Sequence, residues 1–228
     1  MHEVRLTCEG ISRRFFRNGK DKNFFYAVEK TDFELLDGAI TEIVGRSGSG
    51  KTTFANILSG LLSPTEGAVY IDGTDLFALD DEARSKFRNE NIGIVPQGQT
   101  GLSSLTVLEN VLAPANMYGD QKDREPLAKE LLLEMDLLDL SQVYSNELSG
   151  GELRRMSIAR ALINSPGIII ADEPTGDLDD DTTRLVLQLF RRLADEGRSV
   201  LIVTHEHDAQ KYADQIFRME KGILSREQ

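Results

Sequence analysis

The sequence is short of cysteine, of long hydrophobic runs and of positive charge, and each shortage excludes a class of protein. Cys8 is the only cysteine among 228 residues, so no disulfide can form within the chain, and a reducing compartment fits. We expect Cys8 to be a small buried residue rather than a reactive thiol. The longest purely apolar stretches have about five residues, whereas a membrane-spanning helix needs about 20.

The start of the chain lacks a targeting signal, because residues 1–6 have neither a basic start nor an apolar stretch after it. We therefore expect that the chain does not cross a membrane by itself. Lys and Arg total 26 against 38 Asp and Glu, which gives a net charge of −12. An acidic surface repels phosphate backbones, so no nucleic-acid partner is expected.

Short apolar runs alternate with helical patterns, which predicts an α/β fold with a mainly parallel sheet. Neither repeats nor Pro/Gly/Ser linkers interrupt the chain, so a single domain over residues 1–228 is expected. The clearest buried strands are residues 41–44, 92–95, 168–171 and 200–203. Ligands gather beyond the carboxyl ends of such strands, and all four ends carry polar or glycine residues.

Two further regions are predicted beside this sheet. Residues 4–6, 26–28, 32–35 and 68–71 read as short strands of an antiparallel layer. Residues 98–150 read as a helical insert, with a capping box at Thr106 and Glu109 and a second helix over residues 124–135. An apolar stripe over residues 185–193 predicts a last helix, which Gly197 ends.

One glycine-rich segment fits the phosphate-binding loop pattern of Gly, four residues, Gly, Lys and Ser or Thr. It follows a predicted buried strand and opens a helix, which is the context that the pattern requires. Glycines let backbone N–H groups turn inward around phosphate oxygens, and the helix N-terminus adds positive charge. The lysine would reach the β- and γ-phosphates, and the last hydroxyl would bind Mg²⁺. The loop consists of Gly45, Arg46, Ser47, Gly48, Ser49, Gly50, Lys51 and Thr52.

Two acids follow the strand of residues 168–171, whose three isoleucines predict that both of its faces are covered. Asp172 is suited to the Mg²⁺ shell, and Glu173 to orienting or deprotonating an attacking water. A hydrophobic run before two acids is by itself equally typical of a capped strand end. Beside a phosphate loop it indicates hydrolysis.

The segment Leu148, Ser149, Gly150, Gly151, Glu152 precedes a helix expected over residues 153–163. Ser149 and Glu152 have capping-box spacing, so the segment could be simply a well-made helix start. The paired glycines indicate more, because they allow a ligand close to a second helix N-terminus. One nucleotide cannot easily occupy both anion sites of a small domain. A head-to-tail pair of chains, each closing Ser149 over the other's ATP, would use both.

These motifs resemble the nucleotide-binding domain of the ABC ATPase family over essentially the whole chain. The resemblance implies a phosphate-loop NTPase fold, with a RecA-like core and antiparallel layer over residues 1–97 and 151–228 and a helical signature subdomain over 98–150. It implies a homodimer of ATP-hydrolysing subunits, with Mg²⁺ as cofactor, that drives integral membrane permease subunits from the inner face of the cell membrane. The combination of motifs resembles the subgroup for lipoprotein release, macrolide or peptide export and cell division.

The resemblance also implies roles for further residues. Gln97 would contact Mg²⁺ and water, His205 would contact the γ-phosphate, and Thr53 would join the ATP-binding set. Asp177 and Asp179 would lie in the loop that crosses the dimer interface. Phe15 is the first choice for stacking on adenine, with Phe16 and Tyr26 as lesser candidates, while His2 and His207 are given no role.

Three positions depart from the common family pattern, at Glu152, Asp177 and Glu206, and none is a required phosphate contact. Two other readings compete with a transport ATPase. One is a soluble ABC ATPase that acts in DNA repair, on ribosomes or in cluster assembly, and the acidic single domain speaks against it. The other is a phosphate-loop kinase, which would leave Ser149 and His205 without a purpose.

Overall fold

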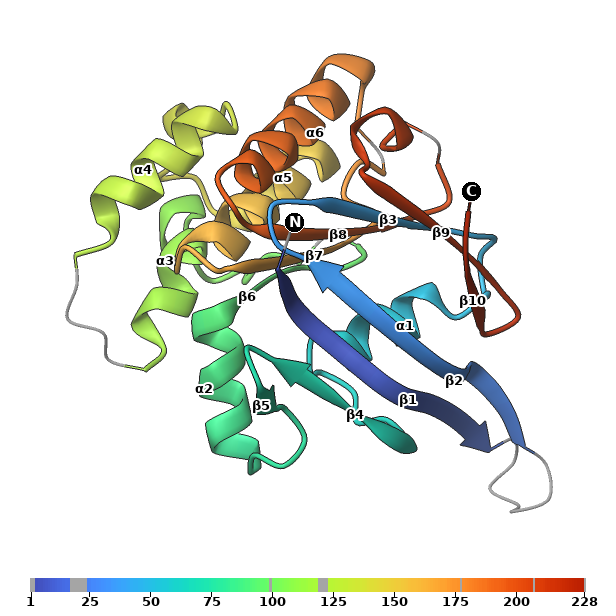
Figure 1. The fold of residues 1–228 in the computed structure, drawn as a ribbon. Helices are drawn as coiled ribbons and strands as arrows, with labels where there is room; N and C mark the ends of the chain where they lie inside the picture. The colour runs from blue at the N-terminus through green and yellow to red at the C-terminus, as the bar shows by residue number, and fades with distance from the viewer. Residues whose placement is uncertain are drawn as a thin grey trace.

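Two sheets and a group of helices make up the structure (Figure 1), a computed structural model that describes residues 3–16, 24–98, 100–118, 123–176, 178–206 and 208–227. The first sheet is antiparallel, in the order β2-β1-β4-β5. Its strands are β1 Val4–Phe16, β2 Phe24–Leu36, β4 Glu66–Ile71 and β5 Thr74–Asp75.

The second sheet has the order β10-β9-β3-β8-β7-β6 and is parallel except at its β9–β10 edge. Every residue of β3, β7 and β8 is buried, which explains their nearly continuous apolar sequences. The predicted α/β fold with a mainly parallel sheet and an antiparallel layer is confirmed. The strands are β3 Ile40–Val44, β6 Ile92–Val95, β7 Ile168–Asp172, β8 Ser199–Thr204, β9 Gln215–Glu220 and β10 Ile223–Arg226.

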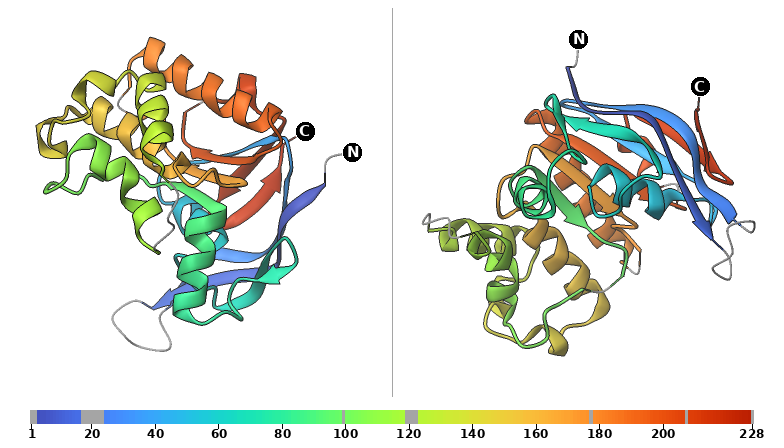
Figure 2. Two further views of the ribbon diagram at one scale, coloured as in Figure 1. Left: turned by 90° about the vertical axis from the view of Figure 1, so that its left-hand side faces the viewer. Right: turned by 90° about the horizontal axis from the view of Figure 1, so that it is seen from below.

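Helices cover both faces of the second sheet (Figures 1 and 2). Alternate residues of β7 and β8 belong to different cores: Ile169 and Ile202 pack in one with α6, whereas Ile170 and Leu201 pack in the other with α1. The α-helices are α1 Lys51–Leu58, α2 Asp81–Asn91, α3 Val107–Asn116, α4 Glu125–Glu134, α5 Gly150–Leu162 and α6 Asp180–Asp195, with 3-10 turns η1 Leu138–Leu140, η2 Ser145–Glu147 and η3 Gln210–Tyr212.

The helical region contains α3, α4 and α5, which pack on one another to one side of the second sheet (Figure 2). The capping box of Thr106 and Glu109 is formed at the start of α3. α5 also packs on β6, so it joins the helical region to the sheet. The last helix, α6, ends where it was predicted to end, with Gly197 at a φ of 95° after it.

The antiparallel layer differs in detail from the prediction. Residues 26–28 and 32–35 lie in one strand, β2, and β1 continues far beyond residue 6. Glu29 and Lys30 are both exposed where the pairing of β1 with β2 shifts register between Ile11 and Arg13, so polar side chains here mark an irregularity within a strand rather than its end. Cys8 in β1 is 2% exposed, and burial raises the pKa of its thiol to about 12, as fits a small core residue.

Among the described helices, none combines the length and apolarity that crossing a bilayer requires.

Glu42 is a buried acid in the centre of the second sheet. It is 0% exposed in β3, between Ile202 of β8 and Ile216 of β9, and neither carboxyl oxygen has a hydrogen-bond partner among the described residues. Burial, aided by the charge of Glu227, raises the pKa of Glu42 to about 7. The fold therefore favours the protonated form of this side chain.

We predict that Glu42→Gln stabilises the protein at alkaline pH. The raised pKa means that wild-type stability is lost as pH rises from the ordinary glutamate value of about 4.3 through about 7. Glutamine keeps the shape and cannot ionise, so its advantage in the free energy of unfolding should shrink by on the order of 2 kcal/mol between pH 8 and pH 5. Urea unfolding at several pH values measures this. The exposed Glu29→Gln is the control, and an advantage of Glu42→Gln that does not change with pH would contradict the prediction.

Candidate functional site

The phosphate loop joins the end of β3 to the start of α1. Gly50 is the N-cap of α1 and offers no side chain, so the first N–H groups of the helix are left for a ligand. The Lys51 ammonium curls back over the loop and donates to the carbonyl oxygens of Gly45 at 2.7 Å and Arg46 at 3.3 Å. Burial lowers the pKa of Lys51. The loop thus holds its lysine over a concave run of backbone.

Two glycines of the loop are required by the backbone packed against them. A Cβ atom on Gly45 would lie 2.3 Å from the Met219 carbonyl oxygen in β9, and one on Gly50 would lie 2.1 Å from the Ala27 carbonyl oxygen in β2. Gly50 also has a φ of 111°, which L side chains rarely adopt. The loop is therefore held closely between strands of the two sheets.

The turn between β9 and β10 fixes the loop from a third direction. The Gly222 N–H donates to the Ser49 carbonyl oxygen at 2.8 Å, and the Gly222 carbonyl oxygen accepts from the Glu29 N–H at 2.8 Å. Gly222 has a φ of 83° and lies against Ala27, so its lack of a side chain allows this approach. One short turn connects the phosphate loop to β2.

Asp172 lies at the end of β7, facing the start of α1. Its side chain is 6% exposed, and one carboxyl oxygen is buried without a hydrogen-bond partner among the described residues. Burial raises the pKa of Asp172, while a hydrogen bond from the Thr52 hydroxyl acts against that rise. Asp172, Thr52 and Gln97 line a common cavity of about 230 Å³. An unpaired oxygen among oxygen donors fits a divalent cation.

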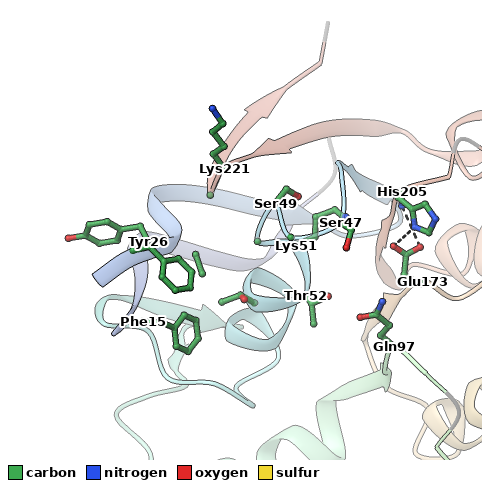
Figure 3. Close-up of a pocket in the computed structure, with 16 residues that line it drawn as sticks. Phe15, Tyr26, Ser47, Ser49, Lys51, Thr52, Gln97, Glu173, His205 and Lys221 are labelled. Carbon is green, nitrogen blue, oxygen red and sulfur yellow. Dashed lines mark hydrogen bonds and ion pairs between the residues drawn. The ribbon is translucent and has the colours of Figure 1, made fainter. Parts of the chain in front are cut away.

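Glu173 and His205 form a pair beside this carboxylate (Figure 3). His205 Nδ1 lies 2.8 Å from Glu173 Oε1, while Glu173 Oε2 accepts from the Thr204 hydroxyl at 2.9 Å. The pKa of His205 is raised chiefly by its hydrogen bond to Glu173. Glu173 has a φ of 51°, an uncommon conformation of the kind that occurs at functional sites. The pair presents an oriented carboxylate with an exposed imidazole.

A cavity of about 590 Å³ is lined by the phosphate loop, Gln97, Glu173 and His205, whereas Asp172 lines the smaller cavity that shares Thr52 and Gln97 with it. Figure 3 shows Phe15 on one side of the phosphate loop and Gln97, Glu173 and His205 on the opposite side. The cavity is lined by Phe15, Phe25, Tyr26, Ala27, Ser47, Gly48, Ser49, Gly50, Lys51, Thr52, Thr53, Gln97, Glu173, His205, Lys221 and Gly222. Its ends differ in chemistry: aromatic rings form one, and ionisable groups the other.

The second anion site lies elsewhere on the molecule. Ser149 is exposed at the start of α5, and neither it nor the two glycines after it line the cavity. The Ser149 hydroxyl donates to Glu152 Oε2 at 2.7 Å and accepts from the Glu152 N–H at 3.4 Å, so the capping box exists. These bonds to Ser149 lower the pKa of Glu152. Among the described residues, a Cβ atom on Gly151 would meet only the Leu178 side chain, at 3.5 Å, so their packing does not require glycine there.

The structure brings together most of the predicted site residues but not all. Gly45 and Arg46 do not line the main cavity, and Phe16 lies outside it. Asp179 caps α6 by accepting from the Thr182 N–H at 2.9 Å. The roles expected of these residues and the division of the domain at residues 98 and 150 stay predictions. Asp177, His2 and His207 lie outside the described residues.

Sequence reasoning missed Phe25, Ala27, Lys221 and Gly222, all of which line the cavity. Phe25 follows Phe24 and precedes Tyr26, so only the pairing of Phe15 with Phe25 across the hairpin distinguishes it. Gly222 is remote in sequence from the loop that it contacts. No local pattern marks either residue.

A phosphate-binding loop, a buried acid suited to a cation and a carboxylate–histidine pair, at the carboxyl edge of a parallel sheet, define a phosphate-loop ATPase. The profile of the ABC transporter family matches residues 28–176, and the chain belongs to this family. The chain is thus an ABC ATPase that binds and hydrolyses ATP, and the kinase alternative is wrong.

Individual relatives agree with this assignment. The chain is 37% identical to the lipoprotein-releasing system ATP-binding protein LolD of Buchnera aphidicola over 98% of both chains. It is 39% identical to the macrolide export ATP-binding/permease protein MacB of a Shewanella strain, over 92% of this chain and 32% of that protein. The ATP-binding cassette MJ0796 of Methanocaldococcus jannaschii, in a dimeric post-hydrolysis structure with ADP and Pi, has a TM-score of 0.89 and 33% identity, covering 97% of this chain and 98% of that one. The predicted resemblance to the lipoprotein-release and macrolide-export subgroup is confirmed.

We predict that Gly50→Ala damages the nucleotide site itself. The added methyl group would meet the Ala27 carbonyl oxygen, so the loop must move and its N–H groups lose their common direction. ATP affinity, measured by isothermal titration calorimetry, should fall at least ~tenfold. Gly73→Ala is the control, because Gly73 has a φ of 77° and open space around it. That change should cost stability of about 1 kcal/mol and leave ATP affinity unchanged; equal ATP affinities in the two variants would contradict the prediction.

Proposed function

We propose that this chain is the ATPase subunit of a membrane export or lipoprotein-handling system, and that two copies close around two ATP molecules. The observation that carries the proposal is the separation of the two anion sites. Lys51 lies in the cavity, whereas Ser149 is exposed on α5 and lines no part of that cavity. Ser149 is therefore available to a nucleotide that is bound to another copy of the chain.

Within one copy, the phosphate loop would hold the β- and γ-phosphates with its N–H groups and Lys51. Thr52, Gln97 and Asp172 would hold Mg²⁺, which when bound supplies positive charge against the phosphate oxygens. Glu173 would orient or deprotonate water, because its carboxylate is fixed by the Thr204 hydroxyl and by His205. The exposed His205 imidazole would face the γ-phosphate.

Between copies, Ser149, Gly150 and Gly151 would contact the γ-phosphate of the partner's ATP, and Glu152 would complete this segment by holding Ser149 in the capping box. In the single copy the Ser149 hydroxyl and N–H both donate to Glu152 Oε2, so the hydroxyl would have to turn from Glu152 toward the phosphate. Asp177 and Asp179 would lie in the loop that crosses the interface. ADP lacks the phosphate that bridges the two copies, so hydrolysis would let them separate. A dimeric structure of the similar cassette MJ0796 supports this arrangement.

Coupling to the membrane would run through the helical region. Gln97 follows β6 at the junction with this region. Along β6, at Ile92 and Ile94, a groove is formed between α2, α3 and α5. Met117 beside it is 63% exposed, which fits a surface that a partner covers. We propose that an integral membrane permease binds in this groove and holds the ATPase on the inner face of the membrane. The names of the LolD and MacB relatives support lipoprotein release or export.

Glu173→Gln should separate ATP binding from hydrolysis. Glutamine is isosteric but cannot act as a base, so the variant should bind ATP and stay closed. Size-exclusion chromatography with light scattering should show a dimer with saturating Mg-ATP and a monomer with Mg-ADP. The double variant Glu173→Gln, Lys51→Ala is the control and should stay monomeric, because it lacks the phosphate ligand. A monomeric Glu173→Gln protein in Mg-ATP would refute the paired arrangement.

Ser149→Asp tests whether Ser149 does more than cap a helix. Aspartate is as good an N-cap as serine, but its carboxylate would meet Glu152 Oε2, which accepts from the serine hydroxyl at 2.7 Å. Parent and variant therefore both carry Glu152→Gln, and their melting temperatures should then stay close. Its negative charge would repel a γ-phosphate, so in the Glu173→Gln background the ATP-dependent dimer should be lost. ATP binding to the monomer should persist, since Ser149 lies outside the cavity. A dimer that survives this substitution would leave Ser149 with the capping role alone.

A further inference from the structure

The β1–β2 hairpin has two faces that differ in what they contact. Its register pairs Phe15 with Phe25 and Phe16 with Phe24. Side chains alternate between faces along a strand, so these two aromatic pairs project from opposite sides of the hairpin. The first pair lines the nucleotide cavity and the second does not. The pair outside the cavity can therefore serve as a control for the pair that lines it.

The pair that lines the cavity forms a continuous aromatic surface. The ring centroids of Phe15 and Phe25 are 6.0 Å apart and their planes are inclined by 32°. The small angle excludes an edge-on contact, and the two planes are tilted. The rings are thus tilted neighbours on the wall of the cavity. Phe25 is 41% exposed, so it keeps surface to offer to a ligand.

The Phe15 ring is supported from its own strand. The Arg13 guanidinium lies 4.8 Å from the centroid of that ring and donates to the Ser63 carbonyl oxygen at 2.9 Å. Arg13 does not line the cavity, so its contact with the ring is made outside it. The ring is therefore positioned before any ligand arrives. This restriction lowers the entropy that a stacked ligand would cost.

The other candidate aromatics do not extend this surface. Phe24 is in edge contact with both Phe16 and Tyr26, with centroids 6.3 Å and 5.6 Å apart, and the Arg14 guanidinium lies over the Phe16 and Phe24 rings. Figure 3 shows the Tyr26 hydroxyl directed away from the phosphate loop. Phe16 and Phe24 thus contact each other outside the cavity, whereas Tyr26, which lines the cavity, is held in edge contact with Phe24.

We infer that Phe25 is a second base-binding residue, and that adenine stacks across Phe15 and Phe25 together rather than on Phe15 alone. The inference rests on the proposed function, in which the phosphate loop holds the phosphates of the same ATP. A purine is wider than one phenyl ring, so two neighbouring rings increase the stacked area. The same geometry gives Phe25 no contact with the phosphates. Its contribution is confined to the base.

The test compares Phe25→Ala with Phe24→Ala, its neighbour on the opposite face. Isothermal titration calorimetry would measure binding of Mg-ATP and of Mg-tripolyphosphate, which has the phosphates without the base. Stacking on a single aromatic residue is worth about a tenfold change in affinity. Phe25→Ala should therefore weaken ATP binding about tenfold and leave tripolyphosphate affinity unchanged. Phe24→Ala should alter neither, and Phe25→Trp should restore ATP affinity.

Different failures of this experiment have different meanings. Equal ATP affinities for Phe25→Ala and Phe24→Ala would overturn the two-ring surface and leave the proposed function intact. An equal loss of ATP and tripolyphosphate affinity in Phe25→Ala would show that the substitution acts through the phosphate loop, and would also overturn the inference. If the unaltered protein bound neither compound, the proposed function and the inference would both be wrong. Circular dichroism would confirm that each variant is folded.

Discussion

Close approach of backbone to backbone around the phosphate loop is the constraint on which the structure depends. The loop passes between Met219 of β9 and Ala27 of β2 with no room for a Cβ atom on Gly45 or Gly50. This approach is one of the places where the parallel sheet meets the antiparallel layer, beside the core that the two sheets share. The hairpin that carries the aromatic rings is thereby held at a fixed place relative to the N-terminus of α1. Binding of the base and of the phosphates follows from one set of contacts.

The ionisable groups of the site are arranged so that few of them are satisfied by the protein alone. Lys51 is bonded only to carbonyl oxygens of its own loop, and Asp172 keeps a buried oxygen without a partner among the described residues. Glu173, in contrast, is fully engaged with Thr204 and His205. Groups that would meet phosphate or cation thus stay available, whereas the group that would handle water is already oriented. The groups that would bind phosphate or cation are buried, and the carboxylate that would handle water is held in place by its hydrogen bonds.

Local patterns were enough to predict the phosphate loop, the acids at Asp172 and Glu173 and the central strands, because each is encoded within a few consecutive residues. The extent of β2 was not predictable in this way, since Glu29 looks like a strand end until the pairing of β2 with β1 is known. Pairing across the hairpin, which places Phe25 in the cavity, depends on register and on the turn. Gly222 donates a hydrogen bond to Ser49, which is distant in the sequence, and no local sequence pattern predicts that contact. The features that the sequence did not predict all depend on contacts between segments that are distant in the sequence.

The turn between β9 and β10 has a consequence for biosynthesis. Gly222 bonds both to the loop, at Ser49, and to β2, at Glu29, and among the described elements these two strands are the last to be made. A nascent chain that has already exposed its phosphate loop, its acids and its aromatic hairpin still lacks this clamp. Tight nucleotide capture would therefore begin only after β9 and β10 have been made, so that a nascent chain without this turn cannot compete for ATP.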